Sequence, residues 1–128
     1  MPAPLVATWT GEAKVSAHTA IRDLIDAGTN GILRIRNSAD ALLGSVTMTD
    51  PCGTVNGTSG QLTITFTGTG SYSLSGTVAY GELCKSDGTA VLSLPAASGT
   101  ASSPGFIVLN TLTAVNGGPI GVLACVIG

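Results

Sequence analysis

Few residues of this chain have the types and spacing needed for catalysis. His18 is its single histidine, and Asp23 and Asp26 follow it closely enough to suggest a site. A Ser-His-Asp triad would also need a nucleophile held by the fold, and the sequence contains no G-x-S-x-G element. We therefore interpret His18 as a helix-surface or cap residue. We expect no catalytic residues and no enzymatic activity.

The acids and cysteines are not spaced like metal ligands. Five acids stand mostly at turns or strand ends, where carboxylates cap backbone amides: Glu12, Asp40, Asp50, Glu82 and Asp87. Calcium would need several acids in one short loop, and zinc would need C-x-x-C spacing, which Cys52, Cys84 and Cys125 lack. A catalytic carboxylate pair from distant segments stays open. We expect no metal, no cofactor and three reduced cysteines, with one disulfide plus a free thiol as the alternative.

The elements that position these residues are one short helix and about eight strands. Five apolar residues recur at helical spacing: Ala17, Ala20, Ile21, Leu24 and Ile25. Ser16 is the expected N-cap and Gly28 the expected C′ residue, while Arg22, Asp23 and Asp26 should face water. The predicted strands cover residues 5–10, 32–36, 42–49, 61–67, 77–85, 90–94, 106–115 and 120–127.

Strands at roughly ten-residue spacing predict a mainly β fold, a sandwich or barrel, in a single domain of residues 1–128. Segments 50–60, 68–75 and 95–105 are expected to be loops. Residues 61–67 alternate apolar and hydroxyl side chains, which indicates a strand with one buried face and one uncharged polar face. The helix interrupts the strands only once, so repeated βαβ units are excluded.

Composition restricts the partners of this protein. Charged residues make up 9% of the 128 residues, and the formal net charge is −2. Only five residues are Lys or Arg, and Arg34 with Arg36 is the only close pair within a strand, so we expect no nucleic-acid partner. The mean hydropathy is +0.46, but no apolar run approaches the ~20 residues of a membrane helix. Part of the apolar surface is therefore expected to be covered by a partner subunit.

Several segments resemble the small structural virion proteins of tailed bacteriophages. The similar segments are 17–23 leading to 31–36, then 46–55, and then 107–111. The resemblance implies a β-rich, non-enzymatic capsid decoration (cement) protein. It also implies the major capsid protein and further copies of the chain, most simply a trimer, as partners. The N-terminus lacks the basic and apolar stretches of a secretory signal. We expect synthesis in the bacterial host cytoplasm and a final location on the capsid surface.

The N-terminal segment is the expected assembly element. Residues 1–10 are predicted to form an extended arm, because two prolines hold the chain open. Pro2, Pro4, Leu5 and Trp9 are its expected assembly contacts, with Trp9 as an anchor. The alternative is that residues 5–10 are the first strand of the domain and that Trp9 packs in its core.

A second functional class stays open beside the capsid role. The chain could be a carbohydrate- or host-binding module of a phage collar, fibre or tail. That function would be favoured by an exposed aromatic platform on which a sugar could stack. Trp9, Tyr72 and Tyr80 are the candidates for it.

Overall fold

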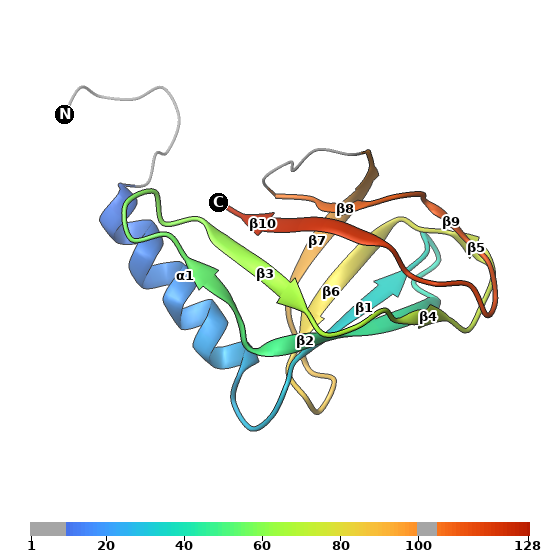
Figure 1. The fold of residues 1–128 in the computed structure, drawn as a ribbon, viewed down its shortest axis with the longest axis horizontal. Helices are drawn as coiled ribbons and strands as arrows, with labels where there is room; N and C mark the ends of the chain where they lie inside the picture. Colours follow the sequence, from blue (N-terminus) through green and yellow to red (C-terminus); the bar gives the residue numbers. More distant parts are fainter. Residues whose placement is uncertain (1–9, 100–104) are drawn as a thin grey trace.

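The computed structural model describes residues 10–99 and 105–128 (Figure 1). Within these residues it has one helix, α1 (Gly11–Ile25), and ten strands. The strands are β1 (Ile32–Arg36), β2 (Leu42–Val55), β3 (Leu62–Phe66), β4 (Ser71–Tyr72), β5 (Gly76–Thr77), β6 (Tyr80–Cys84), β7 (Ala90–Ser98), β8 (Ile107–Leu109), β9 (Thr113–Ala114) and β10 (Val122–Ile127).

Seven of the strands close into a barrel. Their order is β1-β6-β7-β8-β10-β3-β2, and β2 pairs back with β1 to complete the circle. The strand pairs of the barrel are antiparallel except β7–β8, which is parallel. β4 pairs with β2 outside the circle, and β5 and β9 form a separate two-stranded sheet. The predicted mainly β fold with a short helix is confirmed, and its form is a barrel.

The helix covers one end of the barrel. α1 contacts β2, β3 and β7, and Figure 1 shows β4, β5 and β9 at the opposite end. Ile25 is fully buried there and lies close to Gly31, where an added Cβ would come 2.9 Å from Met48 Cε. A short helix is marginal in water by itself. This burial against the barrel therefore supplies most of the stability of α1.

The helix begins earlier and turns a different face inward than the sequence predicts. Thr10, rather than Ser16, is the N-cap, and its side chain accepts a hydrogen bond from the Ala13 N–H at 3.2 Å. Leu24, a member of the predicted apolar stripe, is 48% exposed, while His18 is buried. Gly28 has the expected positive φ of 100°, but it lies two residues beyond the C-cap, Asp26.

Strand β2 runs through much of the predicted 50–60 loop. Between the pairs Met48↔Phe66 and Gly53↔Ile64, four residues of β2 face a single residue of β3. Pro51 lies in this bulge after a cis peptide bond, at a position where no ladder hydrogen bond from its nitrogen is needed. The bulge therefore allows a proline inside a long strand, whereas the local sequence predicted a loop at this position.

Other boundaries also differ from the sequence prediction. The predicted strand 77–85 is divided into β5 and β6, and 106–115 is divided into β8 and β9. The predicted loop 68–75 contains β4, and β7 continues into the predicted loop 95–105 as far as Ser98. These short strands pair with distant segments, so tertiary contacts rather than local patterns define them.

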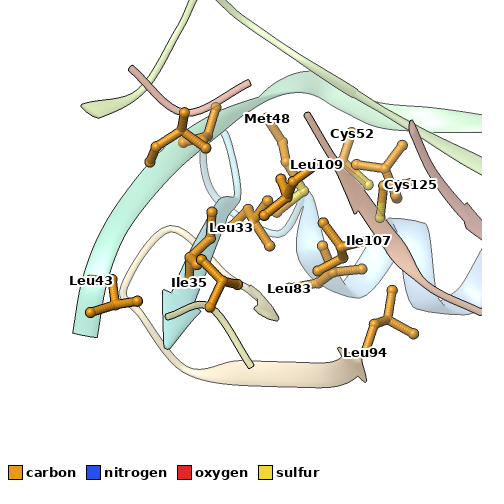
Figure 2. Close-up of a cluster of buried hydrophobic side chains, with 14 of the residues drawn as sticks. Leu33, Ile35, Leu43, Met48, Cys52, Leu83, Leu94, Ile107, Leu109 and Cys125 are labelled. Atoms are coloured by element: carbon orange, nitrogen blue, oxygen red, sulfur yellow. The ribbon is translucent and has the colours of Figure 1, made fainter. Parts of the chain in front are cut away.

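The barrel interior is filled by aliphatic side chains from almost every strand (Figure 2). Leu33 and Ile35 of β1 point inward as predicted, and Cys125 is in the core as predicted. Gly81 of β6 leaves room for Ile107, because a Cβ at Gly81 would clash with Ile107 Cδ1 and lie 3.0 Å from Leu33 Cδ1. The core therefore depends on one small position as well as on large side chains.

Candidate functional site

The predicted assembly contacts Pro2, Pro4, Leu5 and Trp9 lie outside the described residues. Thr10 is the first described residue and caps α1, so it is not the end of a strand as predicted for residues 5–10. The helix beginning at Gly11 thus has its own N-cap and does not need the preceding segment for this purpose. The role of the arm in assembly stays a prediction.

His18 is buried in the junction between α1 and the loop before β3. It is only 6% exposed, and its Nδ1 lies 2.6 Å from the carbonyl oxygen of Gly60. The prediction of a surface or cap residue is therefore wrong. Gly128 packs against the Cε1 atom of the ring, because an added Cβ there would clash with it. These surroundings indicate that His18 connects α1 to the loop before β3 and does not serve as an accessible catalytic base.

Asp26 and Cys52 link the end of α1 to β2. Both carboxylate oxygens of Asp26 accept from the backbone N–H of Cys52, at 2.9 and 3.1 Å. The prediction that Asp26 faces water is therefore wrong. Burial is the main reason that the pKa of Asp26 is raised, and the backbone hydrogen bond from Cys52 opposes this shift. The carboxylate serves as a cap for the backbone in the β2 bulge.

The three cysteines are buried and free, as the sequence predicts. Burial, followed by the charge of Asp26, raises the pKa of Cys52 to about 12, and burial raises the pKa of Cys125 to about 12. Burial also raises the pKa of Cys84. Because the thiolate is the nucleophile and metal ligand, burial of these thiols disfavours both roles at neutral pH.

Residues 10–99 and 105–128 hold neither a metal cluster nor a membrane-spanning helix. In these ranges, no three His, Cys, Asp or Glu side chains are arranged to hold a metal ion. No helix in the same part of the chain is long and apolar enough to cross a bilayer.

A network of ionic and polar side chains occupies the outer face of β1 and β6. Arg36 Nε donates to Glu82 Oε1, and Arg36 Nη1 donates to the backbone carbonyl of Asp40 at 3.0 Å. The Tyr80 hydroxyl donates to Asp40 Oδ1 at 2.7 Å. The bond to Glu82 raises the pKa of Arg36, and the bond to Asp40 raises the pKa of Tyr80. Arg36 is already paired with Glu82. Only Arg34 of the two strand arginines could then contact phosphate, and a single arginine gives weak binding to nucleic acid.

The outer face of β2 and β3, together with Thr67 just after β3, carries six threonines in three cross-strand rows, which we call the threonine ladder. The rows are Thr47 beside Thr67, Thr49 beside Thr65, and Thr54 opposite Thr63. All six are exposed except Thr49, which is half-buried. On β3 the intervening Leu62 and Ile64 are buried, which confirms the alternation predicted for residues 61–67.

Hydrogen bonds fix the side chains of the threonine ladder but leave part of its hydroxyl bonding capacity free. The hydroxyl of Thr67 donates to the Thr47 carbonyl at 3.4 Å, and the hydroxyls of Thr49 and Thr65 bond to each other. Threonine is favoured in strands, and Thr–Thr pairs stabilise neighbouring strands. The ladder is therefore a fixed, uncharged surface whose remaining hydroxyl capacity can bond to another molecule.

A shallow depression of about 190 Å³ lies at the end of the barrel remote from α1, between β4, β9 and the loop before β10. Seven residues line it: Tyr72, Asn110, Thr111, Thr113, Val115, Gly118 and Pro119. Backbone bonds from Tyr72 N–H to the Gly118 carbonyl at 2.9 Å and from Gly117 N–H to the Tyr72 carbonyl at 2.8 Å hold the loop to β4. The lining contains no charged side chain.

The described aromatic candidates do not form an exposed stacking platform. Tyr72 is buried, and its burial raises the pKa of its hydroxyl. Tyr80 is half-buried and bonded to Asp40, while Trp9 lies outside the described residues. The geometry therefore offers two binding surfaces, the polar threonine ladder and the mainly apolar depression, and both are uncharged.

Comparison with protein-family models, curated proteins and solved structures finds no match to this chain. Its candidate function is therefore argued from its own surfaces.

Sequence reasoning predicted one of the two surfaces and missed the other. The alternation in residues 61–67 identified the β3 side of the ladder. The depression combines Tyr72 with residues 110–119, and the Ser71↔Pro119 bridge and the backbone bonds of Tyr72 with Gly117 and Gly118 bring these segments together. The turn 116–119 and the aromatic candidate Tyr72 were the local signals here, but the sequence did not predict that they lie together.

Proposed function

We propose that this chain is a non-enzymatic structural protein of a tailed-bacteriophage virion that binds the outside of the capsid as a decoration, or cement, protein. The observation that carries the proposal is the threonine ladder on a closed barrel. A decoration protein acts through many weak contacts that capsid symmetry repeats, and a fixed hydroxyl surface is suited to such contacts. The sequence resemblance to small phage virion proteins supports the same function.

The partners under this proposal are the major capsid protein and further copies of the chain, arranged as a trimer. The protein would be made in the host cytoplasm and would end on the capsid surface. The closed barrel is well suited to a repeated surface role, because barrel closure leaves few unpaired strand edges that could cause unwanted aggregation. Nucleic acid is not a proposed partner, since the strand arginine pair includes the salt-bridged Arg36.

Capsid particles that lack the chain provide the test. Purified protein is added to them, and bound density is measured by electron cryomicroscopy. We expect density on the outer surface at symmetry-related positions, with binding that persists from about 50 mM to about 500 mM salt, since uncharged contacts are little screened. Light scattering after size-exclusion chromatography measures the molar mass of the protein in solution and so tests whether it is a trimer.

A matched pair of variants tests the threonine ladder itself. The double variant Thr63→Lys/Thr65→Lys places two charges on the exposed face of β3. Ser93→Lys/Ser98→Lys places two charges at exposed positions of β7 and is the control. We expect the first variant to fold and lose capsid binding, and the control to bind normally. Normal binding by the double variant would contradict a role for the ladder, and failure of the wild-type protein to bind any part of the particle would contradict the capsid role.

A further inference from the structure

The depression beside Tyr72 has a feature that the structural role does not use. Tyr72 is only 4% exposed, yet its hydroxyl makes no hydrogen bond to any residue in the described ranges. The hydroxyl is also not sealed inside the protein, since the described part of the chain contains no enclosed side-chain polar atom without a partner. Tyr72 lines the depression, and we infer that its hydroxyl meets solvent on this side.

Buried polar groups are almost always hydrogen-bonded. The Tyr72 hydroxyl has no protein partner among the described residues, so it is free to bond to water or to a ligand that enters the depression. A phenol hydroxyl can donate one hydrogen bond and accept others, so it fits a ligand hydroxyl.

Three further polar side chains surround the same space. The Asn110 side chain lies over Gly121, where an added Cβ would come 2.8 Å from Asn110 Cγ. Thr111 Oγ1 accepts from the Thr113 N–H at 3.2 Å, which leaves the Thr111 hydroxyl hydrogen available to donate. Among the described residues, neither the Asn110 amide nor the Thr113 hydroxyl has a side-chain hydrogen bond. Donors and acceptors are thus both present.

The remaining lining is apolar. Val115 is 59% exposed and stands at the depression together with Pro119. An absence of charged groups in the lining disfavours ionic ligands, because an ion would lose water without gaining a counter-charge. A ligand that fits has several hydroxyls, no charge and an apolar C–H face.

We propose that the depression binds a neutral hexopyranose unit, such as the exposed end of a glycan. Its volume of about 190 Å³ is below the ~300–1,000 Å³ of pockets for drug-sized ligands, which limits it to about one sugar ring. Tyr72, Asn110 and Thr113 bond to the ring hydroxyls, and Val115 and Pro119 contact its C–H face. The site goes beyond the capsid role and lies on different strands from the threonine ladder.

The test is a titration of the full chain with the methyl glycosides of glucose, galactose and mannose, followed by amide NMR shifts. We expect at least one glycoside to shift the amides of Thr113, Val115 and Gly118, with a dissociation constant in the millimolar range, as for other small neutral ligands. No binding at about 100 mM of any of the three, which is far above that range, would overturn the proposal. Shifts confined to β1 and β6 would also overturn it.

Two conservative variants make the assignment specific. Tyr72→Phe removes only the unpartnered hydroxyl, so the urea midpoint should stay unchanged while affinity falls about fivefold, as for the loss of one hydrogen bond. Tyr80→Phe is the matched control, because Tyr80 does not line the depression, and it should bind as the wild type does. Thr113→Val should also weaken binding. Wild-type affinity in both Tyr72→Phe and Thr113→Val would overturn the proposal, whatever the result of the capsid experiment.

Discussion

The Nδ1 atom of His18 lies 2.6 Å from the carbonyl oxygen of Gly60, which is 42 residues further along the chain. A carbonyl oxygen only accepts, so Nδ1 carries the hydrogen and donates it. This contact joins α1 to the loop before β3. It is possible because Gly60 allows a close approach, since a Cβ at Gly60 would clash with Lys14 Cβ on the helix.

We predict that His18→Ala lowers the free energy of unfolding by about 2–4 kcal/mol, since it leaves a cavity and removes the donor to the Gly60 carbonyl. Urea unfolding measures the change. Ser16→Ala is the control, because Ser16 is exposed on the same helix and should shift stability by less than about 0.5 kcal/mol. Equal midpoints for the two variants would show that His18 does not hold the helix.

The close approach of Gly81 to Ile107 predicts that a destabilising change at Gly81 can be offset by a smaller side chain at position 107. Gly81→Ala should cost about 1–3 kcal/mol, because the new Cβ clashes with Ile107 Cδ1. Ile107→Val removes that atom, so the double variant should be more stable than Gly81→Ala alone. Gly57→Ala has open space at its Cβ and should be nearly neutral in the same thermal melts. Additive losses in the double variant would rule out this clash as the cause.

Asp26 should matter through its oxygens rather than its charge. Asp26→Ala removes the acceptor of the Cys52 N–H and should cost about 1–3 kcal/mol in urea unfolding. Asp26→Asn keeps an amide oxygen and avoids burying a charge, so it should cost less than Asp26→Ala. Asp23→Ala, at an exposed carboxylate on the same helix, provides the comparison. A larger loss for Asn than for Ala would contradict this interpretation.

The buried thiols predict a loss of stability in alkaline solution. Thiols of the unfolded chain release their protons near the ordinary cysteine pKa of 9.0, whereas Cys52 and Cys125 in the folded chain keep theirs until about 12. Between these values the folded state binds more protons, so the free energy of unfolding falls as pH rises. Urea midpoints measured across this window should show the fall. The variant Cys52→Ala/Cys125→Ala should show a shallower slope, and an identical slope would assign the effect to other groups.

Deletion of residues 2–9 separates the two interpretations of the N-terminal segment. We expect the shortened chain to fold by circular dichroism, because Thr10 caps α1 without help from the arm. It should assemble less well or bind capsids less tightly, with a loss of about 2 kcal/mol or more from removing Trp9. Failure to fold would instead make this segment part of the core, and unchanged assembly and binding would place the contacts elsewhere.

Strands with local and complete patterns could be predicted from the residues alone. In β1 and β3 the inward side chains alternate with outward ones, and the period of two fixes both the element and its buried face. The mainly β class followed from the repetition of such strands. The chemistry of the threonine ladder was visible in the same alternation along β3.

Tertiary structure decided which face of α1 is buried, how β2 crosses Pro51, and where the depression lies. The helical pattern alone favoured Leu24, but close approach to the loop at Gly60 turned His18 inward. Such choices depend on backbone contacts between segments far apart in sequence, and residue periodicity carries no information about them. The depression beside Tyr72 has the same origin, because β4, β9 and the loop before β10 are distant in sequence and meet only in the folded chain.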